Sequence, residues 1–524
     1  MHSILICDSL EESGLSLLRE AGNAVTVLAA ADRPRLSQLV ADYDAIVVRS
    51  ATKVTAELLR AGKKLKVVGR AGIGVDNVDV PTATELGVLV VNAPTANLLS
   101  ATEHTFALIF SLLRKVPAAD ASMKRGEWDR KSYTGSEVFG KTLGVIGFGR
   151  IGQGVAARAK AFEMNVVAYD PFLDPAVAER LGVKPMELAD LLAASDIVTL
   201  HTPITPETRN LLSAGRLAAM KQGAYLINCA RGGIVDEAAL VAALDAGHIA
   251  GAGVDVFAEE PPTNFDLAKH PKVVATPHIG AQTAEAQERI AIETAKMLAA
   301  ALEGSLPAAA VNLPFRPAGK SGEPYLKLGE RLGRLASLMS GGSLSELRLD
   351  LWGLDEGLRT ALTVASLKGA LEPFLGDGVN YVNAERLAKD RGISVVCALH
   401  SGSSDYPHLV RVSLGGPGGT VELSGALVGE RDPRVVGIGD YRLEFRPEGR
   451  LLWLENQDVP GVVGKLGSAL GAAGVNIAGI HLGRHEVDKR AMAILQLDQE
   501  PAAKVLEQLA ALPEVDRVRY VDLT

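Results

Sequence analysis

Three residues in the middle of the chain have side chains suited to proton transfer and to carboxylate binding. Arg231 follows the apolar run 225–228 and is flanked by small residues. His278 follows the apolar run 273–276, and Glu260 lies between the two in a turn that contains two prolines. A histidine can act as a general base, a carboxylate can orient its ring, and a guanidinium can bind a carboxylate through two hydrogen bonds. The three residue types together predict chemistry on a small carboxylic acid.

The chain holds ten histidines, and most of them are predicted to serve packing or the surface. His104 falls on a helical pattern, His201 ends an apolar run, and His270 precedes a proline in a loop. His278 differs from these because an arginine and a carboxylate accompany it at the ends of predicted strands. Taken alone, Arg231 is equally consistent with a structural ion pair.

A glycine pattern after the apolar run Thr142–Ile146 predicts a dinucleotide-binding turn. Gly147 permits a tight turn, Gly149 lets backbone amides approach a pyrophosphate, and Gly152 allows the following helix to pack closely on the strand. Asp170 ends the next predicted strand. Its carboxylate would accept hydrogen bonds from ribose hydroxyls and repel a 2′-phosphate, so the sequence favours NAD over NADP.

A second glycine pair, Gly72 and Gly74, also follows a predicted strand, but Asn77 stands at the third glycine position. This segment therefore does not complete a dinucleotide-binding pattern. We predict a loop on the substrate side, and the alternative is a plain tight turn.

The composition excludes several classes of protein. At roughly 150 residues per domain, 524 residues predict three or four domains. Apolar residues make up 47% of the chain and charged residues 22%, which excludes disorder as the main state. The net charge of −8 excludes a general electrostatic surface for nucleic acid or for an anionic membrane.

Cysteine spacing and hydropathy exclude further classes of protein. Cys7, Cys229 and Cys397 match neither a zinc-ligand spacing nor a disulfide framework, so no metal site is predicted. No apolar run approaches the ~18–20 residues that span a bilayer. Residues 1–8 lack a basic start and are predicted to form a strand rather than a signal peptide. We expect a cytoplasmic protein.

Alternating apolar runs and helical stretches predict two parallel sheets of the α/β class. The first sheet is expected within residues 1–95, with strands at 4–7, 25–28, 45–49, 66–69 and 88–92. A long helix is expected from 97 to 115. The second sheet is expected to be a Rossmann sheet of six strands, at 142–146, 165–169, 196–200, 225–228, 253–256 and 273–276.

The helix predicted from about 280 to 302 is long enough to cross back to the first domain, which is therefore expected to be discontinuous. The predicted domains are a flavodoxin-like substrate domain (1–95, completed by 280–312), a Rossmann NAD-binding domain (96–279), an additional α/β domain (313–447) and a ferredoxin-like domain (450–524). Prolines and glycines within 307–324 predict a linker. In residues 450–524 the predicted order of elements is βαββαβ, which indicates a ferredoxin-like domain.

These motifs resemble the D-isomer-specific 2-hydroxyacid dehydrogenases. The resemblance rests on residues 144–152 with Asp170, on 228–233, on 255–262 and on 276–280, and on the spacing of Arg231, Glu260 and His278. Residues 49–50, 69–72 and 92–97 resemble the substrate loops of the long-chain members that act on 3-phosphoglycerate. Residues 313–447 resemble their intervening, allosteric substrate-binding-like domain.

The resemblance implies NAD-dependent oxidation of 3-phospho-D-glycerate to 3-phosphohydroxypyruvate, the first step of L-serine biosynthesis. It implies that His278 is the base, that Glu260 orients it, and that Arg231 binds the substrate carboxylate. The implied cofactor residues are Gly147, Gly149, Arg150, Ile151, Gly152, Asp170, Thr202, Cys229, Asp255, Gly280 and Ala281. The implied substrate residues are Arg49, Ser50, Arg70, Gly72 and Asn97.

The C-terminal segment resembles an ACT regulatory domain through residues 458–461 and 474–477. This implies a homo-oligomer, a dimer or a tetramer, with L-serine as an effector bound at Asp458 and Asn476. Some serine-responsive members carry an aromatic residue where this chain has Asn456. That difference favours the alternative that the domain only dimerises.

Two other functions compete with the main prediction. Another D-2-hydroxyacid dehydrogenase, such as a glyoxylate or hydroxypyruvate reductase, would keep Arg231, Glu260 and His278 but would need neither a phosphate pocket nor an ACT domain. An NAD-sensing corepressor on the same fold would need a peptide-binding surface, and no motif for one is evident.

Overall fold

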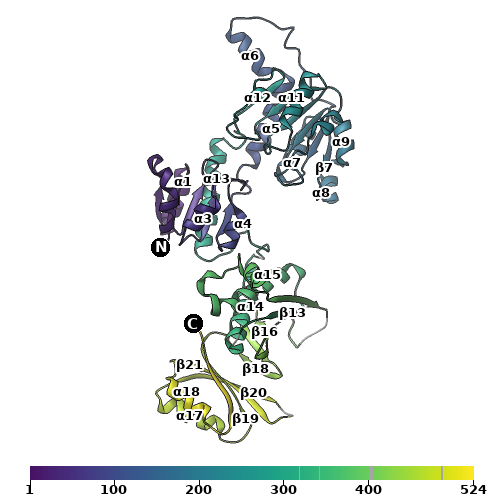
Figure 1. The fold of residues 1–524 in the computed structure, drawn as a ribbon. Coiled ribbons are helices and arrows are strands. Elements are labelled where there is room, and N and C mark those ends of the chain that lie inside the picture. The colour runs from purple at the N-terminus through teal and green to yellow at the C-terminus, as the bar shows by residue number, and fades with distance from the viewer. Residues whose placement is uncertain (318, 342, 402–404, 486–487) are drawn as a thin grey trace.

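Four β-sheets follow one another along the chain. The computed structural model describes residues 1–317, 319–341, 343–401, 405–485 and 488–524, so Ala318 of the predicted linker lies outside the described residues. Figure 1 shows the sheets in a row, with the first between the second and the third. Among the helices described, none is both long enough and apolar enough to cross a membrane.

The first sheet is parallel and has the strand order β2-β1-β3-β4-β5, which is the flavodoxin-like order expected. Its central β-branched strands are buried on both faces, as is usual for parallel strands. The strands are β1 (Ser3–Ile6), β2 (Ala24–Val27), β3 (Ala45–Val48), β4 (Val67–Arg70) and β5 (Leu89–Asn92). The helices are α1 (Glu12–Glu20), η1 (Ala30–Arg35), α2 (Leu36–Leu39), η2 (Val40–Asp42), α3 (Ala56–Ala61) and α4 (Val80–Glu85).

A helix from much later in the chain, α13 (Ala284–Leu302), also packs on this first sheet. Ile290 and Leu298 of α13 belong to the same apolar core as Ile4 and Val67. The chain then runs along the edge strand β5, where the Val311 amide donates to the Val90 carbonyl at 2.7 Å. The first sheet and its core are therefore built from residues that precede the second sheet in the sequence and from residues that follow it.

The second sheet is parallel and has seven strands in the order β12-β11-β10-β9-β6-β7-β8. Six strands were expected, and the seventh, β8 (Lys184–Pro185), is only two residues long and carries no apolar run that could signal it. The others are β6 (Thr142–Ile146), β7 (Asn165–Tyr169), β9 (Ile197–Leu200), β10 (Ala224–Asn228), β11 (Ile249–Val254) and β12 (Val273–Ala275). The strand order reverses between β6 and β9, where doubly wound folds bind ligands.

Helices cover the second sheet. The long helix predicted after the first sheet is present as α5 (Leu98–Leu113) and packs on this sheet. The others are α6 (Val116–Lys124), α7 (Arg150–Ala161), α8 (Pro175–Arg180), α9 (Leu188–Ala194), α10 (Ala214–Ala218), α11 (Glu237–Asp245) and α12 (Asp266–Lys269).

The third sheet has six strands in the order β14-β13-β15-β16-β17-β18, and only the β13–β14 pair is parallel. Its strands are β13 (Glu346–Trp352), β14 (Ser394–His400), β15 (Leu409–Gly416), β16 (Gly419–Val428), β17 (Asp432–Ile438) and β18 (Tyr441–Phe445). Its helices are α14 (Gly319–Ser340), α15 (Glu356–Leu375), η3 (Gly376–Gly378) and α16 (Ala384–Asp390).

The linker prediction is wrong for the end of its range. Helix α14 begins at Gly319, so Pro324 lies inside its first turns. Pro324 is the sixth residue of α14, beyond the first four amides that have no carbonyl partner within a helix, so it removes one hydrogen bond of the helix. A count of prolines could not distinguish this position from an extended linker.

The fourth sheet has the antiparallel order β20-β21-β19-β22 of a ferredoxin-like fold, as expected. Its strands are β19 (Gly449–Gln457), β20 (Ile477–His485), β21 (Arg490–Leu497) and β22 (Val515–Leu523), and its helices are α17 (Val462–Ala472) and α18 (Ala503–Ala510). Both helices contribute to one apolar core with the sheet, through residues such as Leu466 and Leu509.

The contact between α14 and α15 generates a prediction about stability. A Cβ added at Gly369 of α15 would lie 1.9 Å from the Glu330 carbonyl oxygen of α14. Gly369→Ala should therefore destabilise this region by about 1–3 kcal/mol through overpacking. At Gly357 of the same helix an added Cβ meets nothing within 4 Å, so Gly357→Ala should stabilise by about 0.5 kcal/mol. Calorimetric unfolding midpoints that shift equally in both variants would contradict this account.

Candidate active site

The three residues predicted to do chemistry lie at one edge of the second sheet. Strands β10, β11 and β12 are neighbours, and Arg231, Glu260 and His278 follow them in that order. Because the strands are parallel, the segments after them leave the sheet on the same side. The fold therefore brings together groups that are well separated in sequence.

His278 and Glu260 form a close pair. The His278 Nδ1 atom lies 2.6 Å from the Glu260 Oε2 atom. Nδ1 therefore carries the proton that it donates to the carboxylate, which leaves Nε2 as the basic nitrogen of a neutral ring. Both side chains are partly exposed, at 44% and 35%, so a ligand can reach the pair.

The Glu260 carboxylate is held in its charged form. Burial raises the pKa of Glu260, but the hydrogen bonds from His278 and from the Phe257 amide outweigh it and keep the pKa below its ordinary value. A charged carboxylate beside Nδ1 stabilises the imidazolium that forms when Nε2 takes up a proton.

Asp255 shapes the turn that presents His278. Its carboxylate is 1% exposed and accepts from the Ile279 amide at 2.8 Å and from the Gly280 amide at 2.9 Å. The Thr276 hydroxyl donates to the same carboxylate at 2.6 Å. These bonds hold His278 at φ +53°, in the left-handed region that few non-glycine residues adopt. The structure thus gives Asp255, predicted to bind cofactor, a positioning role.

His104 lies on α5 beside this turn rather than in the pair. Its Nε2 atom is 3.2 Å from the Asp255 carboxylate and 3.0 Å from the Thr276 hydroxyl. The neighbouring Cys229 follows β10, and burial raises the pKa of its thiol to about 12, with Asp255 acting in the same direction. The thiol is therefore neutral at physiological pH and packs as a small apolar group.

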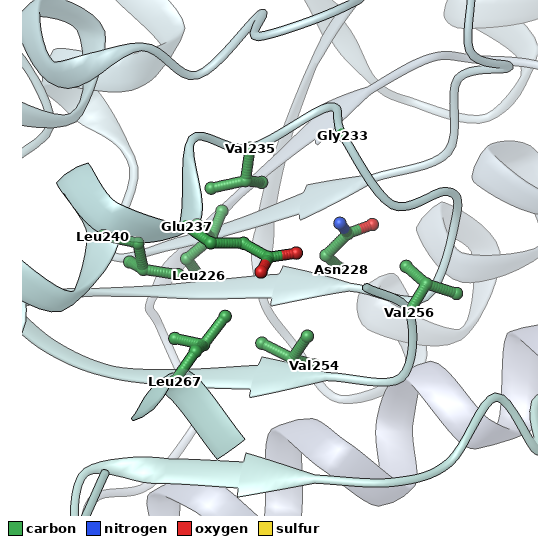
Figure 2. A pocket seen from close by; sticks show the side chains of 9 residues that line it. All are labelled: Leu226, Asn228, Gly233, Val235, Glu237, Leu240, Val254, Val256 and Leu267. Carbon is green, nitrogen blue, oxygen red and sulfur yellow. The ribbon is translucent and has the colours of Figure 1, made fainter. Parts of the chain in front are cut away.

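Two polar side chains fix the loops after β10 and β11. Asn228 donates from Nδ2 to the Arg231 carbonyl at 3.0 Å, and Glu237 accepts from the Ala258 amide at 2.6 Å. Figure 2 shows both side chains around a small cavity lined mainly by apolar residues. The cavity measures about 10 Å³, which is near the lower limit for one water molecule and excludes a substrate.

Arg231 has a partner that the sequence analysis missed. Its Nε atom donates to the Asp76 carboxylate at 2.8 Å, although the two residues lie 155 positions apart and belong to different sheets. Asp76 stands in the loop that contains Gly72 and Gly74. The substrate-side interpretation of that loop agrees with this placement, but no local pattern indicated Asp76.

Two of the predicted substrate residues, Arg49 and Arg70, follow or end neighbouring strands of the first sheet. The Arg49 amide donates to the Asp8 carboxylate at 2.7 Å, and the Thr52 hydroxyl donates to the same carboxylate at 2.8 Å. Asp8, which sequence reasoning missed, thus shapes the turn that carries Arg49 and the exposed Ser50.

Burial distinguishes Arg70 from the other arginines of this group. It lowers the pKa of Arg70 to about 10, nearby Arg231 and Arg49 act in the same direction, and Asp76 opposes them. Arg70 remains charged at physiological pH. Gly72 has φ +147°, a backbone conformation that favours glycine, and a Cβ there would also displace the end of the Arg70 side chain, whose Nη1 atom lies 1.6 Å from that position.

The glycine-rich turn before α7 has the geometry of an anion cradle. Gly147 has φ +91°, and a Cβ at Gly152 would lie 2.2 Å from the Gly147 carbonyl oxygen. A Cβ at Gly149 would meet nothing within 4 Å, so the space above the start of α7 is open. Asp170 accepts from the Phe148 amide at 2.7 Å and from the Phe172 amide at 2.8 Å, which places its carboxylate beside the turn.

A cleft of about 660 Å³ joins this turn to the loops of the first sheet. Its volume is typical of small-molecule sites. Arg150 and Ile151 line it from α7, Asn92 lines it from β5, and Arg316, which sequence reasoning missed, lines it from the segment after α13.

Three buried polar atoms in predicted site residues have no hydrogen-bond partner: Arg70 Nε, Asn97 Oδ1 and Thr202 Oγ1. Such atoms are rare in folded proteins, so these three atoms are available to bond a ligand. Gly280 and Ala281 follow His278, where the Gln287 side-chain amide donates to the Ala281 carbonyl at 2.7 Å. In the described part of the chain, no group of three potential ligands is placed to hold a metal ion.

The predicted effector residues lie in the fourth domain and already have partners. Asp458 accepts from Arg484 Nε at 2.6 Å, and Asn476 donates to the Asp498 carboxylate at 2.6 Å. Added Cβ atoms at Gly461, Gly464 and Gly467 would meet nothing within 4 Å, so this side of α17 is open.

Three regions match known protein families. Residues 106–280 match the D-isomer specific 2-hydroxyacid dehydrogenase NAD binding domain. Residues 322–439 match the D-3-phosphoglycerate dehydrogenase intervening domain, and residues 454–514 match the ACT domain.

Relatives and solved structures agree with these matches. D-3-phosphoglycerate dehydrogenases from Bacillus subtilis (strain 168) and Methanocaldococcus jannaschii are each 40% identical, with 100% of this chain and of each relative covered. A D-lactate dehydrogenase structure from Aquifex aeolicus, complexed with NAD and lactic acid, is 30% identical at TM-score 0.54 and covers 59% of this chain and 98% of its own. The TT0316 protein from Thermus thermophilus is 37% identical at TM-score 0.55, covering 59% and 99%.

Proposed function

Because this chain belongs to the D-3-phosphoglycerate dehydrogenase family, within the D-isomer-specific 2-hydroxyacid dehydrogenases, we propose that His278, Glu260 and Arg231 are its catalytic residues. The enzyme oxidises 3-phospho-D-glycerate to 3-phosphohydroxypyruvate with NAD, which is the first step of L-serine biosynthesis. The observation that carries the residue assignment is the 2.6 Å contact between His278 and Glu260.

His278 accepts the proton of the substrate C2 hydroxyl at Nε2, because Nδ1 is committed to Glu260. A general base in this position contributes about 10²–10⁴-fold to the rate. Glu260 keeps the ring in one tautomer and stabilises the imidazolium. Bound NAD supplies the acceptor for the C2 hydride.

Arg231 binds the substrate carboxylate beside the pair. Its guanidinium can form two parallel hydrogen bonds to a carboxylate and polarise the neighbouring C2 oxygen. Arg49 and Arg70 bind the phosphate, since their mutual repulsion with Arg231 is relieved by a ligand that carries several negative charges.

The turn around Gly149 and the start of α7 hold the NAD pyrophosphate. An α-helix N-terminus presents free amides to an anion, and the open space at Gly149 allows the approach. The Asp170 carboxylate accepts hydrogen bonds from the adenosine ribose hydroxyls. Its negative charge repels the 2′-phosphate of NADP and so excludes that cofactor. The unpartnered Thr202 hydroxyl and the turn at Gly280 and Ala281 support the nicotinamide side of the site.

We also propose that the enzyme is a homo-oligomer in the cytoplasm. The open side of α17 offers a surface through which two ferredoxin-like modules can pair. Three free cysteines are consistent with a reducing compartment.

The first prediction about function tests the acid–base assignment. With 3-phospho-D-glycerate and NAD, His278→Ala should lower kcat by orders of magnitude, because the base is gone, and should leave NAD binding nearly unchanged. Arg231→Ala should also raise KM, since the carboxylate loses its partner. NADH absorbance gives the rates and calorimetry gives the NAD affinity. Near-normal kcat in His278→Ala would refute the assignment and make His104 the next candidate.

The second prediction concerns the phosphate. Replacing Arg49 or Arg70 by Ala should lower kcat/KM for 3-phospho-D-glycerate by about 10- to 100-fold, the value of one or more charge-assisted hydrogen bonds. The rate with unphosphorylated D-glycerate should change far less. Arg35→Ala, at an exposed position at the end of η1, is the matched control. Equal losses on both substrates would mean that these arginines support structure rather than phosphate binding.

The third prediction concerns L-serine, which we propose binds at Asp458 and Asn476. The amine of the ligand would take the place of Arg484 on Asp458, because both are cations. Calorimetry on the intact enzyme should show binding, and Asp458→Ala should abolish it. Glu507→Ala on α18, an exposed carboxylate, should bind normally. No heat from millimolar L-serine on the intact enzyme would leave the module with an assembly role only.

A further inference from the structure

The ion pair between Asp76 and Arg231 joins the two sheets that border the cleft. Asp76 belongs to a loop of the first sheet, and Arg231 follows β10 of the second. Their contact at 2.8 Å is a hydrogen bond between charged groups, which is among the stronger kinds in proteins. The side chain of Asp76 is 51% exposed and that of Arg231 is 27% exposed, so a ligand can reach the pair.

The contacts of the Arg231 guanidinium fix its plane. Nε donates to Asp76, and Nη1 donates to the Ala230 carbonyl at 2.6 Å. Nη2 lies so close to Gly74 that a Cβ there would be 1.9 Å away. A guanidinium has five N–H groups, so the two bonds leave three of them, including both on Nη2, for a ligand. Asp76 thereby decides which edge of Arg231 is presented.

The loop that carries Asp76 is itself firmly attached to the first sheet. Asn77 donates from Nδ2 to the Arg49 carbonyl and to the Thr52 carbonyl, each at 2.6 Å. Asn92 donates to the Ile73 carbonyl at 2.5 Å. The position of the Asp76 carboxylate is thus set by the same turns that carry Arg49.

The charges around Arg231 also favour its contact with Asp76. Arg49 and Arg231 both lower the pKa of Arg70, so this region carries an excess of positive charge. Asp8, the other nearby carboxylate, already bonds the Arg49 amide, Thr52 and Arg33. Asp76 is the carboxylate that contacts the Arg231 guanidinium in the described part of the chain. A ligand that binds at Nη2 adds to this contact rather than replacing it.

We propose that Asp76 is a positioning residue for the dehydrogenase reaction, which holds Arg231 from across the cleft in the orientation that aligns the substrate carboxylate. The inference rests on the catalytic role of Arg231 proposed above. It has a consequence for the closing of the cleft: Arg231 is correctly oriented only when the first and second sheets approach closely enough for the ion pair to form. Cleft closure and substrate alignment are then one event.

The fourth prediction follows from this proposal. Asp76→Ala should lower kcat/KM for 3-phospho-D-glycerate by about 10- to 100-fold, the usual effect of a misaligned reacting group. Asp76→Asn should lose less, because its amide oxygen can still accept from Nε. Glu57→Gln, which removes an exposed carboxylate from α3 of the same domain, should behave as the unmodified enzyme.

Two measurements separate positioning from a general structural effect. The deuterium isotope effect on kcat, with substrate deuterated at C2, should rise in Asp76→Ala, because hydride transfer becomes slower relative to product release. A variant that merely contains less folded enzyme would keep the isotope effect unchanged. In the double variant Asp76→Ala/Arg231→Ala, kcat/KM should fall within about twofold of Arg231→Ala alone, because residues that act as a unit are not additive.

Each result has a definite meaning. If Asp76→Ala stays within about twofold of the unmodified enzyme, or if its loss multiplies fully with that of Arg231→Ala, the positioning role is refuted while the proposed function stands. If Arg231→Ala itself retains full activity on 3-phospho-D-glycerate, the catalytic assignment of Arg231 fails first. The two failures are therefore distinguishable in one set of assays.

Discussion

Three guanidinium groups placed near one another, those of Arg49, Arg70 and Arg231, impose the main physical constraint on this structure. Burial lowers the pKa of Arg70, and the repulsion from Arg231 and Arg49 lowers it further. The fold meets the constraint by dividing the charges between two sheets, with Arg49 and Arg70 on the first and Arg231 on the second. Asp8 and Asp76 then compensate the charge from fixed positions. A substrate that carries both a carboxylate and a phosphate is the complement of this arrangement.

The acid–base pair requires a different environment, and the second sheet provides it. In the proposed mechanism His278 must present Nε2 to the substrate, and the contact of Nδ1 with Glu260 determines which ring nitrogen is presented. The buried Asp255 carboxylate sets the backbone of the His278 turn through the Ile279 and Gly280 amides. Orientation is thus supplied by two separate carboxylates, Asp255 for the backbone and Glu260 for the ring.

Local patterns in the sequence predicted the parts of the fold that local geometry determines. The glycine turn before α7, the strand ends that carry Arg231 and His278, and the ferredoxin-like order of the last module all follow from residue type and short-range spacing. Asp76 could not be predicted in this way, because its partner is 155 residues away and the contact depends on how two sheets approach each other. Strand β8 lacked a signal for a simpler reason: two residues paired at the edge of a sheet need no apolar pattern.

The third domain contacts the catalytic part of the chain at the first sheet. Asn380 donates to the Gly87 carbonyl at 2.7 Å, and Arg386 lies 3.4 Å from the Glu85 carboxylate of α4. Val382 completes the apolar core that contains β1, β4 and α13. Coupling between distant sites needs an element with two arrangements, and the first sheet is the body that the third domain and the cleft share. A shift of this sheet would move Asp76 relative to Arg231, so the proposed control of catalysis from a distant site would act through this ion pair.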